Sequence, residues 1–214
     1  MHMRSWDLRR HIIYLAALLF LSIFFIGICI LLYDGPFTFR DVCISNLGNP
    51  LYNPRGWWVF SLGMCLLAVL IIPHVVYLYK RVDFGVELLR KAWFLLVMVG
   101  VFGMFMVGIV NETNYGLHIA FAAFAFGGYG LAMILSILVM IIRVIRGKKW
   151  PDARSFSVLL VLLLGFLMVI VSEILKYGIN NPADLNFTEW MAFFLILTWI
   201  YGLTFVGEES TSKD

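Results

Sequence analysis

Charged residues are scarce in this sequence of 214 residues. They make up 14% of the chain, whereas an ordinary soluble domain contains about 25%. Hydrophobic residues make up 62%, and the mean hydropathy is +0.93. This composition excludes a soluble globular domain, a disordered chain and a nucleic-acid-binding domain. Since a membrane-spanning helix needs roughly 20 residues, the chain has room for at most about six or seven spans.

Ionisable residues are missing from the middle of every long apolar stretch. Ion-coupled transporters usually place acidic, basic or histidine side chains deep in the membrane. Paired glycine or proline interruptions, which mark a binding site at the membrane midplane, are missing as well. The sequence therefore argues against an ion or proton pathway, while transfer of a lipid stays open as a minor alternative.

Cysteine, histidine and known catalytic motifs are also sparse. Cys29 and Cys65 fall in apolar stretches and Cys43 in a loop, so we predict no disulfide. His118 is far in sequence from the other three histidines, and we expect no metal site and no cofactor. Neither Gly-X-Ser-X-Gly nor His-Glu-X-X-His occurs, so no established hydrolase signature is present.

Six long apolar stretches are present instead, each bounded by charges or turn residues. They cover residues 11–33, 57–79, 92–110, 117–142, 155–175 and 189–206. Each is long enough to cross a hydrocarbon layer of about 30 Å as a helix, and none alternates as a barrel strand would. We predict an all-α bundle of six transmembrane helices, with residues 1–214 as a single membrane domain and 207–214 as a tail.

The basic residues are distributed unevenly over the predicted connections. Thirteen of the 16 Lys and Arg fall on the side that carries both termini, and three fall on the other side. Cytoplasmic segments carry the excess of basic residues in membrane proteins. We therefore predict a multi-pass protein of the cell membrane with both termini in the cytoplasm.

Asparagine shows the opposite distribution. All eight asparagines fall in the three connections assigned to the outside: Asn46, Asn49, Asn53, Asn111, Asn114, Asn180, Asn181 and Asn186. Turn chemistry explains part of this pattern, and loop turns that merely cap helices are one interpretation. The other is an outward-facing surface rich in uncharged hydrogen-bonding groups. The two Asn-X-Thr sequons, at Asn111 and Asn186, lie close to helix ends, and we expect neither to be glycosylated.

The first outer connection, residues 34–56, is the longest. A loop of this length in a compact bundle is usually functional or disordered. Its many apolar residues argue against disorder. We expect the loop to be structured and to fold back over the outer mouth of the bundle, with a short helix.

The same loop carries a family resemblance. It contains Ile44-Ser45-Asn46-Leu47-Gly48-Asn49-Pro50, then Asn53-Pro54 and a helix beginning Trp57-Trp58-Val59-Phe60. A second element is Val107-Gly108-Ile109-Val110, followed by His118 and the small and aromatic run 122–128. Over residues 11–206 the chain resembles the membrane proteins grouped as domain of unknown function 998. That family is similar to the damage-regulated autophagy modulators and to a GPI-anchor remodelling factor.

The resemblance implies a six-helix bundle with a role in membrane-lipid organisation or remodelling. It supplies no catalytic mechanism. Some members carry an acidic or cysteine-containing element where this chain has Asn111-Glu112-Thr113.

Several polar residues near the outer boundary are candidates for a site. An enzyme would use His118 as general base, Glu112 or Asp41 to orient it, and Ser45 or a water as nucleophile on a lipid ester or phosphodiester. Alternatively, His118 and Glu112 form a buried hydrogen-bonded pair that ties the outer turn to the bundle. Further candidates for contact with a lipid are Asn46, Asn49, Asn53, Asn111, Asn114, Glu173, Lys176 and Glu189.

Two functions of different classes follow. The first is an outer-leaflet pocket that binds or remodels a lipid or amphiphile. The second is a non-enzymatic scaffold that binds another membrane protein or a second copy through a small-residue face. That face is predicted on the fourth helix, with spacing 4, 3, 4, 3, at Gly116, Ala120, Ala123, Gly127 and Gly130.

Overall fold

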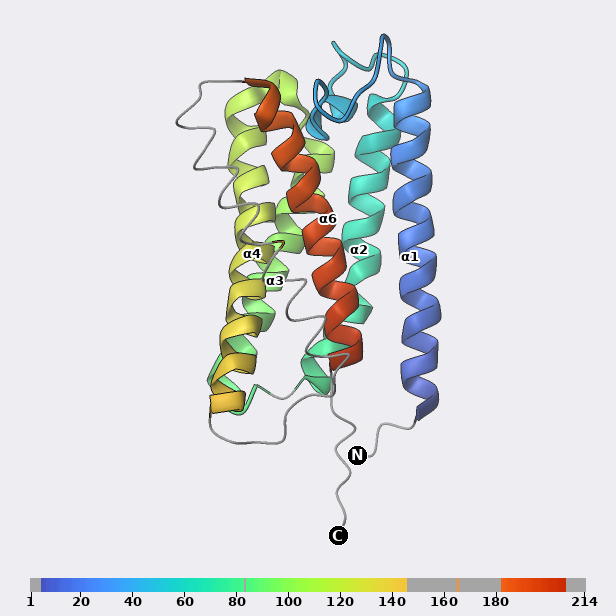
Figure 1. The fold of residues 1–214 in the computed structure, drawn as a ribbon. Helices are drawn as coiled ribbons and strands as arrows, with labels where there is room; N and C mark the ends of the chain where they lie inside the picture. The colour runs from blue at the N-terminus through green and yellow to red at the C-terminus, as the bar shows by residue number, and fades with distance from the viewer. Residues whose placement is uncertain (1–4, 83, 146–164, 166–181, 207–214) are drawn as a thin grey trace.

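The computed structural model describes residues 5–82, 84–145, 165 and 182–206. Its long helices are α1 (Ser5–Leu31), α2 (Trp57–Arg81), α3 (Glu87–Ile109), α4 (Tyr115–Ile145) and α6 (Pro182–Val206) (Figure 1). Two short 3-10 helices, η1 (Ser45–Gly48) and η2 (Glu112–Asn114), lie before α2 and α4. These described ranges contain no strand, in line with the predicted all-α fold.

The long helices have the length and composition of membrane spans. Five of them carry apolar segments of 19 to 31 residues, enough to cross a bilayer. The predicted stretch 155–175 lies outside the described residues except for Gly165, which is helical. A Cβ atom built at Gly165 would lie 2.5 Å from Cδ1 of Leu195 in α6. The protein is thus a helical membrane protein, and a sixth span stays a prediction.

Some helix ends differ from those predicted. Helix α6 begins at Pro182, seven residues before the predicted start at Glu189. Proline suits the first position of a helix, because its φ angle is already helical and its missing N–H has no role there. Helix α1 begins at Ser5 and includes Arg9 and Arg10. Arginine is a good helix former, so the basic residues extend the helix instead of ending it.

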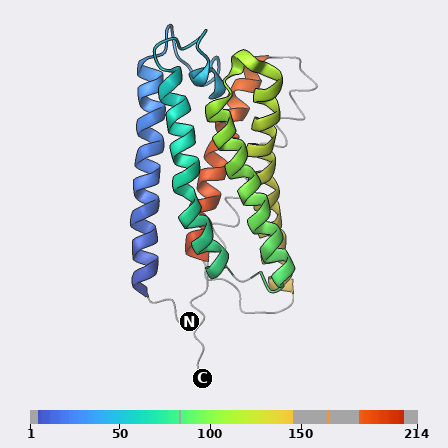
Figure 2. The same cartoon turned by 180° about the vertical axis from the view of Figure 1, so that it is seen from behind.

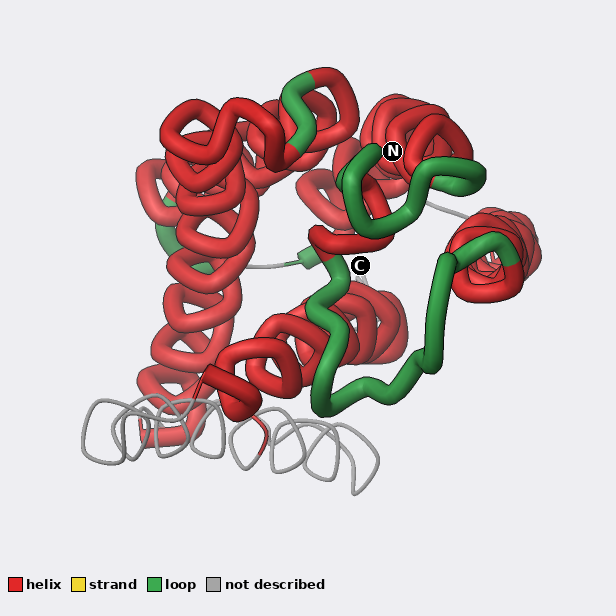
Figure 3. The backbone as a smooth tube through the Cα atoms, turned by 90° about the horizontal axis from the view of Figure 1, so that it is seen from above, coloured by secondary structure: helices red, strands yellow, loops and turns green. Residues whose placement is uncertain are grey.

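The helices stand side by side along one axis. Helix α1 begins and α6 ends at one end of the bundle, and the loop 32–56 and η2 lie at the other, which we call the loop end (Figure 1). From behind, α2 and α3 stand in front of α6 (Figure 2). Seen from the loop end, the loop runs from α1 past α6 and returns to α2 (Figure 3).

Glycines bring α3 and α4 into close contact. A Cβ atom built at Gly103 of α3 would lie 2.7 Å from the backbone oxygen of Phe121. A Cβ atom at Gly128 of α4 would lie 2.8 Å from the backbone oxygen of Leu96. In a membrane, where helices associate mainly by close packing, such small residues allow two backbones to approach each other.

The small-residue face predicted on the fourth helix does not make this contact. Ala125 and Gly128 face α3. Residues of the predicted face, such as Ala123, Gly127 and Gly130, lie one or two positions away along α4 and point in other directions. Gly116, Ala120, Ala123 and Gly127 are exposed, and Gly130 is half-buried. No described atom lies within 4 Å of a Cβ built at Gly116, Gly127 or Gly130. In the described bundle, this face is therefore not the packing surface, and its role in binding a partner stays a prediction.

The first loop is structured, as its composition predicts. Its apolar residues Val42, Ile44 and Leu47 are buried together with Cys29 of α1 and Phe60 of α2. This second core lies beneath the loop, apart from the larger core between the helices. The loop therefore folds over the end of the bundle and contributes the short helix η1.

Hydrogen bonds hold α6 against the rest of the protein at both ends. At the loop end, Nε1 of Trp190, which is 2% exposed, donates to the backbone oxygen of Val42 at 2.8 Å. At the opposite end, Nε2 of His74 and Oγ1 of Thr204 are 3.1 Å apart. These bonds fix the height of α6 relative to the loop and to α2.

Candidate functional site

A buried asparagine determines the shape of the loop above the bundle. Asn53 is 0% exposed. Its Nδ2 donates to the backbone oxygens of Leu47 and Cys29 at 2.9 and 3.2 Å, and its Oδ1 accepts from Gly56 N at 3.0 Å. A buried amide whose groups are engaged in this way holds backbone in place. Asn53 therefore supports the site, whereas the sequence placed it in contact with a lipid.

A second contact joins the loop to α6. Oγ of Ser45 donates to a carboxylate oxygen of Glu189 at 3.1 Å. The backbone N–H of Ser45 points to the same oxygen at 3.4 Å. Sγ of Cys43 lies 3.2 Å from Oγ of Ser45. The carboxylate of Glu189 therefore connects α6 to the start of η1. A negative charge is favourable near the N-terminal end of a helix.

A third contact joins the loop to the turn before α4. Nδ2 of Asn49 donates to Oε2 of Glu112 at 2.9 Å. Oδ1 of Asn111 accepts from the backbone N–H of Thr113 at 3.1 Å and caps η2. The turn and the loop are therefore linked directly.

His118 lies one turn inside α4 and is 4% exposed. Its Nδ1 lies 2.7 Å from the backbone oxygen of Val110. Because a carbonyl only accepts, Nδ1 carries the proton and, in the neutral ring, Nε2 is an acceptor. The structure has no hydrogen bond between His118 and Glu112, the pair that the sequence suggested; Glu112 accepts from Asn49 instead.

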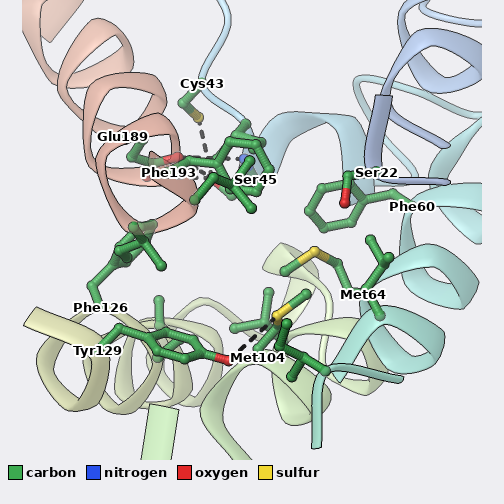
Figure 4. A pocket seen from close by; sticks show the side chains of 18 of the residues that line it. Ser22, Cys43, Ser45, Phe60, Met64, Met104, Phe126, Tyr129, Glu189 and Phe193 are labelled. Atoms are coloured by element: carbon green, nitrogen blue, oxygen red, sulfur yellow. Dashed lines mark hydrogen bonds between the residues drawn. The ribbon is translucent and has the colours of Figure 1, made fainter. Parts of the chain in front are cut away.

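These polar groups surround one end of a cavity of about 390 Å³ inside the bundle. Ser45, Glu112, His118 and Glu189 all line it. They belong to the loop, to η2 or to the first turns of α4 and α6, so they lie at the loop end. Figure 4 shows Glu189 and Ser45 facing each other on one side of the space.

The rest of the cavity wall is mostly apolar. It is lined by Met64 of α2, Met104 of α3, Phe126 of α4 and Phe193 of α6, with Phe60 and Tyr129 close by (Figure 4). On α1 the lining reaches from Ser22 to Leu15, four turns below the end of the helix. The cavity therefore combines a polar loop end with an apolar shaft along the helices.

Comparison with known families adds one finding. A family described as protein of unknown function (DUF998) matches residues 14–206. The chain belongs to the DUF998 family. No curated protein and no solved structure matches it. The matched region of this DUF998 protein includes the loop, η2 and all the described residues that line the cavity.

The structure brings together some of the predicted site residues of this DUF998 protein and separates others. Ser45, Glu112, His118 and Glu189 meet at the cavity. The other described candidates, Asp41, Asn46, Asn49, Asn53, Asn111 and Asn114, lie outside its lining. Glu173 and Lys176 are outside the described residues.

The arrangement also differs from the catalytic relay considered for Ser45. Its hydroxyl is bonded to Glu189, and the ring of His118 is bonded to Val110. Asp41 is exposed and accepts from Oγ1 of Thr38 at 2.5 Å. Within the described part of the chain, no three His, Cys, Asp or Glu side chains are grouped so as to hold a metal ion.

Two residues of the DUF998 site were not expected from the sequence. Asn186 and Cys43 line the cavity next to Glu189 and Ser45. Asn186, Glu189 and Phe193 recur at helical spacing and share one face of α6. That spacing was visible in the sequence, but the predicted start of the helix at Glu189 left Asn186 outside it.

We expect the thiol of Cys43 to react slowly. Burial, together with the charge of Glu189, raises the pKa of Cys43 to about 12, so the thiol stays protonated at pH 8, and only the thiolate attacks. Alkylation by iodoacetamide, followed by peptide mass spectrometry, should be about a hundredfold or more slower at Cys43 than at an exposed cysteine introduced by Asn114→Cys. The rate should rise with pH until about 12. Similar rates at the two positions at pH 8 would contradict this picture of the site.

Proposed function

We propose that this DUF998 protein spans the membrane six times, with its loop end outside, and that its cavity binds a lipid or amphiphile from the outer leaflet. The headgroup would lie among Ser45, Glu112, His118 and Glu189, and the hydrocarbon chain would follow the apolar shaft. The observation that carries the proposal is the cavity itself, because its ionisable groups gather at one end and the remaining wall is mostly apolar. Its volume is in the range of small-molecule sites.

The orientation in the proposal rests on charge. The side assigned to the cytoplasm holds 13 of the 16 Lys and Arg, as the positive-inside rule requires. With both termini cytoplasmic, the loop end faces the outer leaflet of the cell membrane. Headgroups of that leaflet lie at the depth of the helix ends, where the polar groups of the cavity also lie.

Native mass spectrometry of gently extracted protein tests the proposal. We expect an amphiphile to co-purify with the natural sequence and to be lost, by fivefold or more, from Ala122→Phe, because Ala122 lines the shaft and a phenyl ring would fill it. The matched control is Ala17→Phe, on an exposed face of α1 outside the cavity. Ser22→Leu, on the opposite wall, gives a second blocking variant should Ala122→Phe fail to fold.

The outcome separates the pocket from its rival. A protein without a bound amphiphile, or with equal amounts in all variants, would contradict the pocket. The rival is a scaffold that binds a partner through Gly116, Ala120, Ala123, Gly127 and Gly130, and it is favoured by the exposure of that face among the described residues. If Gly127→Leu breaks up a purified assembly while the amphiphile is unaffected by Ala122→Phe, the scaffold function is supported instead.

A further inference from the structure

The polar end of the cavity offers hydrogen-bond acceptors and few free donors. The acceptors are the carboxylates of Glu112 and Glu189 and the Nε2 of His118. That nitrogen has no hydrogen-bond partner among the described residues, although the side chain is 4% exposed. His118 lines the cavity, so a ligand there is placed to donate to this nitrogen.

The nearest donors of the protein are already in use. Oγ of Ser45 donates to Glu189 at 3.1 Å, and Nδ2 of Asn186 donates to the backbone oxygen of Asp41 at 2.9 Å. Tyr115, which also lines the cavity, is 68% exposed and lies at its rim. The second N–H of Asn186 is the donor that its bond to Asp41 leaves over. A headgroup that only accepts hydrogen bonds would still leave the carboxylates and Nε2 of His118 without a donor from the ligand.

The charges favour the same kind of ligand. Glu112 and Glu189 both line the polar end of the cavity. Of the described residues that line the cavity, none is Lys or Arg. Two carboxylates that share a partly buried site are destabilised unless a positive charge lies near both. An anionic phosphate or carboxylate headgroup would add to the repulsion, whereas an ammonium group would remove it.

We propose that the ligand of the cavity is an amphiphile whose headgroup carries an ammonium group, held between Glu112 and Glu189 and donating to Nε2 of His118. This inference rests on the proposed function and makes the headgroup class specific. The contacts that Glu112 and Glu189 already accept, from Asn49 and Ser45, leave further lone pairs on each carboxylate for the ligand. Charge-assisted hydrogen bonds of this kind are the strong ones.

Four probes with the same 14-carbon chain test the inference on the full chain in a neutral detergent. They are tetradecylamine, tetradecyltrimethylammonium, tetradecanol and tetradecanoate, and binding is measured by native mass spectrometry and by the shift of the thermal-unfolding midpoint. We expect tetradecylamine to bind about tenfold or more tightly than tetradecanol, and tetradecanoate to bind least. The trimethylammonium probe, which has charge but no N–H donor, should fall between the amine and the alcohol.

Isosteric variants connect the preference to the two carboxylates. Glu189→Gln and Glu112→Gln keep the shape and an accepting oxygen but remove the charge, and each should lower tetradecylamine affinity by about tenfold while leaving tetradecanol unchanged. The matched control is Asp34→Asn, which removes one charge from an exposed position of the loop 32–56, at the same end of the bundle.

The outcomes distinguish the inference from the proposed function. If tetradecanol or tetradecanoate binds as tightly as tetradecylamine, and Ala122→Phe abolishes binding, the ammonium inference is overturned and the pocket stands. If all probes bind equally and Ala122→Phe has no effect, the pocket fails as well. A preference for tetradecylamine that survives both glutamine variants would also overturn the inference, because the carboxylates would then not be its source.

Discussion

Asn53→Ala is expected to lower the free energy of unfolding by about 3 kcal/mol or more. The substitution removes three hydrogen bonds from a side chain that is 0% exposed. It leaves the backbone oxygens of Cys29 and Leu47 buried without this partner, while the N–H of Gly56 keeps its bond to the backbone oxygen of residue 53. Each unsatisfied buried group costs about 1–3 kcal/mol. Titration with a denaturing detergent, with thermal unfolding as a second method, measures the loss.

Asn114→Ala is the matched control for Asn53. It removes the same side chain from an exposed position at the end of η2, and its effect should stay within about 0.5 kcal/mol. The Asn53 variant should also lose ligand, because the loop that carries Ser45 is no longer held. Equal stability of the two variants would show that Asn53 does not organise the loop.

Gly128→Ala is expected to destabilise the protein by about 2 kcal/mol, while Gly127→Ala should be neutral or slightly stabilising. A methyl group at Gly128 meets the backbone of α3, including the oxygen of Leu96 at 2.8 Å. Backbone cannot rotate away as a side chain can, so α3 and α4 must separate, and overpacking of this kind costs about 1–3 kcal/mol. At Gly127 no described atom lies within 4 Å, and alanine is the better helix former by up to about 1 kcal/mol.

The pair is informative because the two glycines are adjacent in sequence. Both variants add one methyl group to the same turn of α4, so effects on helix propensity and on hydropathy are the same. Thermal unfolding of the two proteins in one detergent gives the difference directly. If Gly127→Ala is the more damaging variant, the small-residue face lies at a packed contact and the helix phase described for α4 is wrong.

The sequence predicted the helices well because membrane spans are defined by length and apolar content. It could not show which face of α4 packs against α3, since Gly and Ala occur on two of its faces. The spacing of Gly116, Ala120, Ala123, Gly127 and Gly130 is regular, yet the contact with α3 uses Ala125 and Gly128. A small residue shows where a close approach is possible, and only the neighbouring helix decides where one occurs.

The sequence named several residues of the candidate site but not the contacts between them. The asparagines predicted for the site lie in the loop and at η2, at the same end of the bundle as the ionisable groups of the cavity. The sequence could not show that Asn53 would turn inward to hold backbone while Glu189 accepted from Ser45, because the two residues of each contact are brought together by the fold. The contact between Ser45 and Glu189 joins positions 144 residues apart.

Photocrosslinking tests the central claim, an amphiphile inside the bundle, most directly. The probe is an alkylamine with a diazirine in its chain, added to the protein in a neutral detergent, irradiated and mapped by peptide mass spectrometry. We expect crosslinks on the cavity-lining faces of α4 and α6, around Phe126 and Phe193, that unlabelled tetradecylamine and the Ala122→Phe substitution both suppress. Crosslinks confined to exposed side chains such as Phe20 and Phe24 of α1, and unchanged by the competitor and by Ala122→Phe, would contradict it.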